Sequence, residues 1–322
     1  MNKTLKIALN ILIFLLIAGF GYYMVKSMMS KKETVSSNEE STESTFISPY
    51  KKTTNFDATS EIKCFYAYEN VLYLALADKI SVFDLSGKHQ RDFAINADVC
   101  DMMVNDATVY VLYPTRLDLY TLDGQKKGGW EACSDNSDYC AFTATKDYIF
   151  VTDAANKNIV QYDKQGALVR FIKSPEGFVI PSYSFDIISI NDTVYCANSG
   201  MHKIESYTLD GEFIASFGEA GTGAGAFAGC CNPAFLEKIP SSHILTSEKG
   251  SPRISSYGKD GKFRTILFDG NMLNSGTTAC EMHVSGQSIY IANGPTISVY
   301  TLDTNCLEQS CAGCKVECPL RK

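Results

Sequence analysis

The pentapeptide YTLDG occurs twice, at residues 120–124 and 207–211, and its pattern of an aromatic residue followed four positions later by glycine recurs along the chain. The instances are Phe83 with Gly87, Tyr120 with Gly124, Tyr162 with Gly166, Tyr207 with Gly211, Tyr257 with Gly261, and a sixth aromatic, Tyr300, that has lost its glycine. Successive aromatic residues are 37, 42, 45, 50 and 43 positions apart. A period near 40 residues is typical of a repeat architecture.

Each repeat contains four short β-like runs. The glycine lies between two of them, where a hairpin turn needs residues that tolerate positive φ. A further run precedes the aromatic in every unit: 71–74, 109–112, 148–152, 193–197, 243–246 and 288–292. Another precedes that one, as at 100–104, and the last follows the glycine, as at 212–217. Four strands in each of six units, without helical periodicity, predict an all-β six-bladed β-propeller over residues 45–304. A parallel solenoid is the alternative, although its repeats are usually shorter.

Two segments resemble the NHL-repeat family of propellers. The stretch FGEAGTGAGAFAGCCNP, at 217–233, is similar to the family's path from Phe-Gly through a glycine-rich loop to Phe and Pro. The stretch VTDAANKNIVQY, at 151–162, is similar to its middle hairpin. The resemblance covers residues 62–304 and implies the six-bladed fold. It implies no activity, because such propellers serve many functions.

Closure of the ring can be predicted from the chain ends. The sixth unit ends its third strand near Asp303, and the residues after it are rich in cysteine rather than strand-like. We therefore expect the missing outer strand to come from the segment Thr45–Asp57, which would pair the two ends and remove open edges. Residues 305–322 would then form a tail outside the sheets.

The N-terminus reads as a membrane anchor. Residues 1–6 are basic, and Ile7–Val25 contains nineteen residues without a charge. As a helix this segment spans about 28 Å, the thickness of a bilayer core. A cleaved signal peptide is the alternative, but no Ala-x-Ala follows the apolar run. Residues 26–44 are rich in Ser, Thr and Glu and predict a flexible linker. We expect a single-pass protein of a bacterial cell membrane, with the propeller on the extracytoplasmic side.

Composition excludes several classes of function. The chain has 322 residues, 45% of them hydrophobic, and a net charge of −7. This excludes global disorder and gives no basic surface for nucleic acid, so we expect no nucleic-acid partner. The sequence has no nucleophile elbow, phosphate-binding loop or zinc-protease motif. Enzymatic activity is left open, with binding favoured, and His283 is expected to be an ordinary sheet residue.

Five cysteines occupy related places in the repeats. They start the first strand of units one, two, three, five and six: Cys64, Cys100, Cys140, Cys231 and Cys280. Phe185 holds this place in unit four. Because first strands line the channel of a propeller, the repeat predicts a ring of thiols around one channel mouth. The ring could be small apolar filling, disulfides between blades, or ligands of a metal or cluster.

Four more cysteines lie in the tail, as CLEQSCAGCKVECP: Cys306, Cys311, Cys314 and Cys318. The last three, with the proline, resemble the bacterial ferredoxin run that holds 4Fe-4S clusters, but the first gap is four residues instead of two. The resemblance implies a 4Fe-4S cofactor. The same residues also suit a Zn(Cys)4 site, two local disulfides or free thiols.

Unit five carries a denser polar group of residues. GCCNP begins the unit and SEKGSPR crosses its middle hairpin, which together supply Cys230, Asn232, Glu248, Lys249 and Arg253. Lys249 and Arg253 could bind an anion or the carboxylates of a partner. The alternative is a solvated turn with an ion pair.

Two functions of different classes follow. In the first, the protein is a membrane-anchored NHL-like propeller that acts as a binding or scaffold module for a protein partner. In the second, it is a membrane-tethered electron-transfer protein that holds an iron–sulfur cluster through its tail and channel-mouth cysteines.

Overall fold

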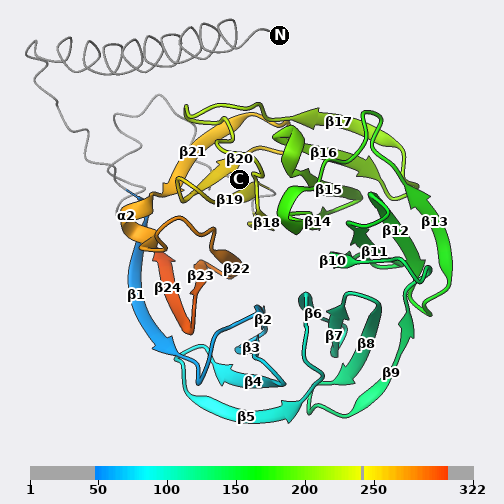
Figure 1. Ribbon diagram of the computed structural model, residues 1–322. Coiled ribbons are helices and arrows are strands. Elements are labelled where there is room, and N and C mark those ends of the chain that lie inside the picture. Colours follow the sequence, from blue (N-terminus) through cyan, green and yellow to red (C-terminus); the bar gives the residue numbers. More distant parts are fainter. Residues whose placement is uncertain (1–47, 241–242, 304–322) are drawn as a thin grey trace, which may run out of the picture. The chain divides into compact units, whose positions relative to one another are not determined.

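A computed structural model describes residues 48–240 and 243–303, and these form six four-stranded antiparallel sheets arranged around one axis (Figure 1). This confirms the all-β six-bladed propeller. The predicted anchor at 7–25, the linker at 26–44 and the tail at 305–322 lie outside the described residues. Within the described part of the chain, no helix has the length and apolar character needed to cross a membrane.

The sheets follow the chain order, with the first strand of each innermost. Blades 1 to 3 are β2 (Cys64–Tyr68), β3 (Val71–Ala75), β4 (Lys79–Asp84), β5 (His89–Ala94); β6 (Asp101–Asn105), β7 (Thr108–Tyr113), β8 (Arg116–Thr121), β9 (Lys126–Glu131); β10 (Tyr139–Ala144), β11 (Tyr148–Asp153), β12 (Asn158–Asp163), β13 (Leu168–Ile172). Blades 4 and 5 are β14 (Ile187–Ile190), β15 (Thr193–Asn198), β16 (Lys203–Thr208), β17 (Phe213–Phe217); β18 (Phe235–Lys238), β19 (Ile244–Glu248), β20 (Arg253–Tyr257), β21 (Phe263–Phe268). Short helical turns are η1 (Pro181–Tyr183), η2 (Ser199–Met201) and α2 (Gly270–Leu273).

Blade 6 joins the two ends of the propeller. Its strands are β22 (Glu281–Ser285), β23 (Ser288–Asn293), β24 (Thr296–Leu302) and β1 (Tyr50–Asp57). β1 pairs antiparallel with β24, from Tyr50 opposite Leu302 to Asp57 opposite Thr296. The predicted closure is therefore confirmed, and the last strand of the ring is the first of the chain. The ring can open at blade 6 only if the hydrogen bonds between β1 and β24 all break.

The repeated glycine has two physical roles. Gly124 has φ +91°, a conformation that side chains rarely adopt, and a Cβ atom there would overlap the ring of Phe93 on the preceding blade. The same arrangement recurs around the ring: Phe56 over Gly87, Trp130 over Gly166, Ile172 over Gly211 and Phe217 over Gly261. Each glycine thus permits the turn and, because it has no Cβ, leaves space for a side chain from the outer strand of the preceding blade.

The hydrophobic core lies between neighbouring blades. Tyr73 and Val82 of blade 1, for example, pack against Met102 and Val109 of blade 2, and all four are buried. Packing of each sheet on the next leaves the edges of the innermost strands facing the axis. The six inner strands therefore supply the residues of the candidate site.

Candidate functional site in the axial pocket

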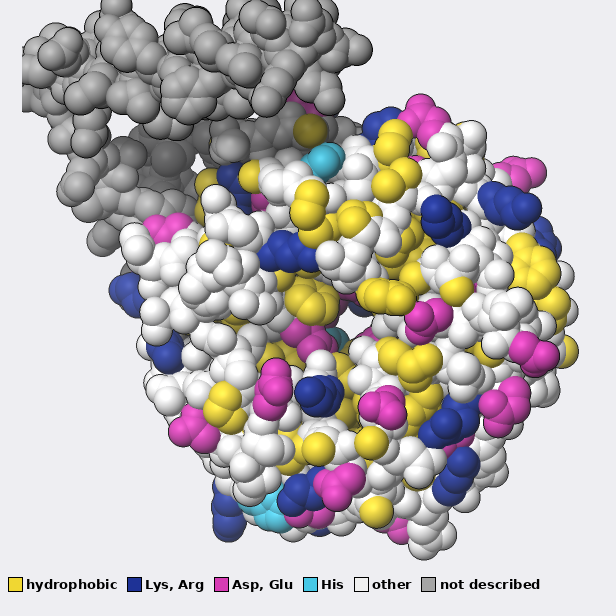
Figure 2. All heavy atoms as spheres, in the orientation of Figure 1, with side chains coloured by type: hydrophobic (Ala, Val, Ile, Leu, Met, Phe, Trp, Pro, Cys, Tyr) yellow, Lys and Arg dark blue, Asp and Glu magenta, His cyan; other side chains and the backbone are white. Residues whose placement is uncertain are grey.

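The inner strands surround a pocket on the propeller axis with a volume of about 550 Å³. All six blades contribute lining residues, from β2, β6, β10, β14, β18 and β22 and the turns beside them. Figure 2 shows the axial opening, with hydrophobic side chains around it and acidic side chains on its wall. This volume is within the range of small-molecule and side-chain binding sites.

Three carboxyl groups alternate around the pocket. Asp101, Asp186 and Glu281 belong to blades 2, 4 and 6 and occupy equivalent places at the start of their inner strands. Blades 1, 3 and 5 have non-acidic residues at this place: Cys64, Ala141 and Phe235. The pocket wall therefore has an approximate threefold pattern in a ring of six sheets.

Each of these carboxyl groups accepts a backbone hydrogen bond from the next blade. Oδ2 of Asp101 accepts from Phe142 N at 2.9 Å, and Oδ2 of Asp186 accepts from Leu236 N at 2.6 Å. Oε1 of Glu281 accepts from Phe65 N at 3.1 Å. The acids thus connect the blades in pairs, 2 to 3, 4 to 5 and 6 to 1. Their side chains are rigidly placed before any ligand arrives.

Burial raises the pKa of all three carboxyl groups. The pKa of Asp186 rises to about 7, although its backbone hydrogen bonds oppose the change. The pKa of Asp101 rises well above its ordinary value through burial and the charge of Asp186, and that of Glu281 does so through burial and the charge of Asp101. Carboxyl groups with raised pKa in a cavity are typical of functional sites.

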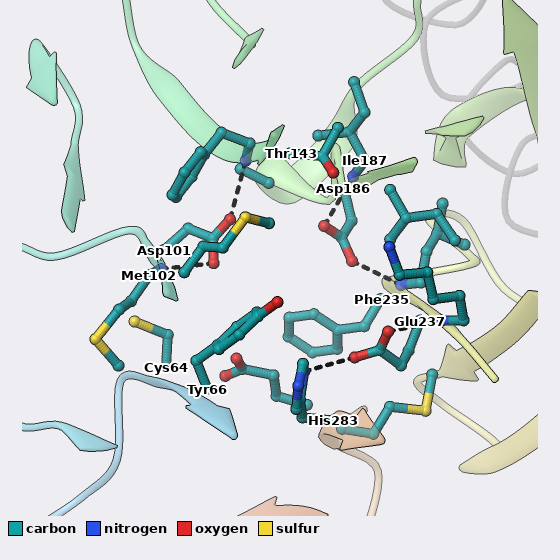
Figure 3. Close-up of a pocket in the computed structure, with 18 of the residues that line it drawn as sticks. Cys64, Tyr66, Asp101, Met102, Thr143, Asp186, Ile187, Phe235, Glu237 and His283 are labelled. Carbon is teal, nitrogen blue, oxygen red and sulfur yellow. Dashed lines mark hydrogen bonds and ion pairs between the residues drawn. The ribbon is translucent and has the colours of Figure 1, made fainter. Parts of the chain in front are cut away.

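A second group of pocket side chains comes from the inner strands β2, β18 and β22. Figure 3 shows Tyr66, Glu237 and His283 pointing into the pocket. Oε2 of Glu237 lies 2.7 Å from Nδ1 of His283, and the His283 ring lies 4.1 Å from the Tyr66 ring between centroids. Two lysines also line the pocket. Lys63 pairs with Glu61, and Lys238 donates to the Ser189 carbonyl at 2.8 Å.

The structure brings three of the five predicted ring cysteines to the pocket, namely Cys64, Cys100 and Cys140. Cys231 and Cys280 are buried at the starts of blades 5 and 6 but do not line it. The described cysteines are free thiols. Burial raises the pKa of the Cys100 and Cys140 thiols to about 12, so both are protonated at neutral pH.

Metal binding by the thiol ring stays a prediction. Across residues 48–240 and 243–303, no three His, Cys, Asp or Glu side chains are placed to hold a metal ion together. The thiols of Cys100 and Cys140 instead point at the carbonyls of Asp98 and Asp138, at 3.8 and 3.7 Å. The predicted cluster ligands Cys306, Cys311, Cys314 and Cys318 lie outside the described residues.

The polar group of unit five divides into two parts. Arg253 forms a bidentate ion pair with Glu248, at 2.7 and 2.9 Å, and also donates to the carbonyls of Gly223 and Ala226. Its guanidinium is therefore engaged with the protein's own loop. The second part contains Asn232, whose Oδ1 accepts from Lys249 N at 2.9 Å and whose Nδ2 donates to Lys249 O at 2.9 Å.

The acidic wall of the pocket was not predicted from the sequence. The signal was present, because the aligned residues Cys100, Phe185 and Cys280 are each followed by an acidic residue. His283 was not singled out as a pocket residue either. It lies in a strand as expected, but its side chain lines the pocket and pairs with Glu237.

These features define a six-bladed β-propeller with an acid-lined axial pocket, and comparison with solved structures gives the same fold. The chain is similar to virginiamycin B lyase from Staphylococcus aureus, with a TM-score of 0.54 and 15% identity over 79% of this chain and 99% of that one. It is also similar to a protein of unknown function from Bacteroides thetaiotaomicron, with a TM-score of 0.59 and 13% identity over 79% and 74% of the two chains. The Pan2 WD40 domain of Neurospora crassa has a TM-score of 0.55 and 9% identity over 80% and 97%.

Identities this low show the fold alone. No family model matches the chain, so its membership of the NHL-repeat family is not confirmed. No curated protein matches it either.

Proposed function

We propose that the protein is a membrane-anchored binding module whose axial pocket receives a basic side chain of a protein partner. The acidic lining of the pocket carries this proposal. Four carboxyl groups face a common cavity, those of Asp101, Asp186, Glu237 and Glu281, and two lysines and one histidine also line it. The negative charges of the carboxyl groups raise one another's pKa. A bound cation would offset the repulsion between these charges and stabilise the ionised carboxylates.

The aromatic residues of the pocket suit the same ligand. Tyr66 and Phe235 line the cavity beside the carboxyl groups. An arginine or lysine group is attracted to an aromatic face as well as to a carboxylate. A cavity of about 550 Å³ has room for one such side chain with its hydration water.

A protein is the favoured source of the cation because apolar side chains are exposed in one sector of the propeller. Across residues 48–240 and 243–303, the exposed large hydrophobic side chains lie between residues 168 and 214: Leu168, Val169, Phe171, Val179, Tyr183, Phe213 and Ile214. Tyr183 is 65% exposed and also lines the pocket. Exposed apolar patches are typical of protein interaction sites. Anchoring by the segment 7–25 would keep the protein at the membrane, where membrane proteins are available as partners.

The test uses the full-length protein in detergent, with an oligoarginine peptide and the matching citrulline peptide as neutral control. We expect the arginine peptide to bind and the citrulline peptide not to bind, in calorimetry at about 0.15 M salt. The double variant D101N/D186N should weaken binding at least about tenfold, which is about 1.4 kcal/mol. The exposed Asp135 supplies the control D135N, which should bind as the parent does. Equal affinity of the parent and the double variant would contradict the proposal.

Binding should also depend on pH in a defined direction. Because the pKa of Asp186 is raised to about 7, this group holds a proton below that pH and must release it to pair with a cation. We therefore expect affinity to rise with pH up to about pH 7, by at most about tenfold per pH unit for one released proton. Affinity that falls as pH rises would exclude this account.

The electron-transfer alternative rests on the channel-mouth cysteines and on the tail cysteines, and the tail lies outside the described residues. It stays a prediction. Iron and sulfide analysis of protein purified without oxygen would test it, since a cluster held by four thiolates contains both.

A further inference from the structure

Two adjacent cysteines of blade 5 are placed differently from the other described thiols. Sγ of Cys230 lies 3.1 Å from Sγ of Cys231. A disulfide bond is about 2.05 Å long, so the sulfurs need to approach by only about 1 Å to bond. Cys230 is exposed, whereas Cys231 is 3% exposed. One sulfur can therefore meet a molecule in solution while the other stays protected beneath it.

The loop around the pair is held in place by Asn232. Its side chain bonds both the N–H and the carbonyl of Lys249, and it donates to the Ala228 carbonyl at 2.5 Å. These contacts fix the cysteine pair against the hairpin that carries Lys249. The Lys249 ammonium lies 3.3 Å from Oγ of Ser184.

The pair also lies next to the mouth of the axial pocket. Sγ of Cys231 lies 4.0 Å from Oγ of Ser182, and the following residue, Tyr183, lines the pocket. Ser182 and Tyr183 both have left-handed backbone conformations, with φ of 57° and 56°. Consecutive non-glycine residues in this region are costly, and such strain concentrates at functional sites.

The charges around the pair favour one thiolate. Burial acts to raise the pKa of Cys231, but the Lys249 ammonium and a hydrogen bond from the Cys230 thiol outweigh it and lower the pKa. The same hydrogen bond raises the pKa of Cys230. For five other thiols burial raises the pKa: Cys64, Cys100, Cys140, Cys196 and Cys280. The surroundings of the pair therefore favour the thiolate of Cys231, whereas those of the other five thiols disfavour ionisation.

We propose that Cys230 and Cys231 form a redox-active vicinal dithiol that reduces an organic disulfide at the mouth of the axial pocket. The reacting form is the singly deprotonated pair, in which the proton of Cys230 first passes to Cys231 along their hydrogen bond. The Cys230 thiolate then attacks one sulfur of the substrate, so that the substrate's S–S bond breaks, a mixed disulfide forms and one thiolate leaves.

The second step takes place within the mixed disulfide and needs no further reactant. Cys231 gives its proton to the leaving thiolate and attacks the Cys230 sulfur, which forms the Cys230–Cys231 disulfide and releases the second thiolate. Two electrons pass from the dithiol to the substrate, and the one proton of the pair leaves on a product thiol. Lys249 acts as a positioning residue that stabilises the negative charge on the pair.

The test treats the reduced full-length protein with glutathione disulfide, in a background where the four tail cysteines are serine, and maps peptides by mass spectrometry. We expect the peptide with Cys230 and Cys231 to lose the mass of two hydrogen atoms and to carry no glutathione. The exposed Cys133, which has no cysteine next to it in the sequence, should carry a glutathionyl adduct and serves as the internal control. In C231S the mixed disulfide should persist on Cys230.

Two further measurements separate reactivity from mere exposure. K249M should slow the reaction at pH 7 by about threefold for each unit by which the thiol pKa rises, because the greater nucleophilicity of the thiolate partly offsets its lower population. The rate should recover at higher pH. The same assay with insulin as the substrate tests whether the pair also reduces a protein disulfide. A stable glutathionyl adduct on Cys230 in the parent protein would overturn the proposal. So would an unmodified pair in a sample where Cys133 has reacted.

Discussion

Replacement of Asp186 by asparagine should change how the stability of the propeller depends on pH. The pKa of this carboxyl is about 7 in the folded protein, against 3.8 for an unperturbed group. Below about pH 4 both the folded and unfolded chains hold the proton, so the group has no effect. Between the two values the unfolded chain releases the proton and the folded chain keeps it, so stability falls as pH rises. Above about pH 7 the loss is complete.

The magnitude follows from the two pKa values. A difference of about 3 units, at 1.36 kcal/mol each, gives at most about 4 kcal/mol lost by the parent between pH 4 and pH 7. Asparagine removes this loss. It also leaves one of two backbone donors, Ile187 N or Leu236 N, without an acceptor, because its Nδ2 cannot accept. That costs about 1–3 kcal/mol at every pH.

Urea unfolding of the full-length protein, followed through its one tryptophan, Trp130, measures the effect. We expect D186N to be less stable than the parent by about 1–3 kcal/mol near pH 4, and its disadvantage to shrink or reverse near pH 8. D186N also removes the charge of Asp186 that raises the pKa of Asp101 and Glu281, so these two groups change the difference in the same direction as Asp186 itself. Parallel stability curves from pH 4 to pH 8 would refute the account of the buried acid.

Three further predictions concern the fold. G124A should lower the free energy of unfolding by at least about 2 kcal/mol, because its Cβ would overlap Phe93 of the neighbouring blade. G223A, with open space around it, should leave the free energy of unfolding unchanged. Equal values for both variants would contradict the close packing of Phe93 on Gly124. R253M should destabilise by about 3–5 kcal/mol because it leaves the buried Glu248 unpaired, and R253M/E248Q should recover part of the loss, as denaturant titration would show. Removal of residues 304–322 should leave one cooperative unfolding transition, and its loss would show that the tail is structural.

The number of blades could be predicted from the sequence because each blade repeats the same local demands. A hairpin turn needs a residue of positive φ, and the structure adds that Phe93 leaves no space for a Cβ on Gly124. Both demands act on one residue, so glycine is retained at almost every turn. The closure by Tyr50–Asp57 followed from counting strands, since a sixth blade with three strands leaves an unpaired edge.

The pocket was harder to predict because its pattern has a different period. The fold repeats once per blade, but Asp101, Asp186 and Glu281 occur in every second blade, each binding the N–H of the blade after it. When all six units are superposed, this position holds an acid in three blades and Cys64, Ala141 or Phe235 in the others, so no common residue is seen. Superposition of three pairs of blades would have shown the acid at once. A propeller whose site has such a two-blade period is better compared with itself by pairs, because the groups that bind a ligand are those by which neighbouring blades differ.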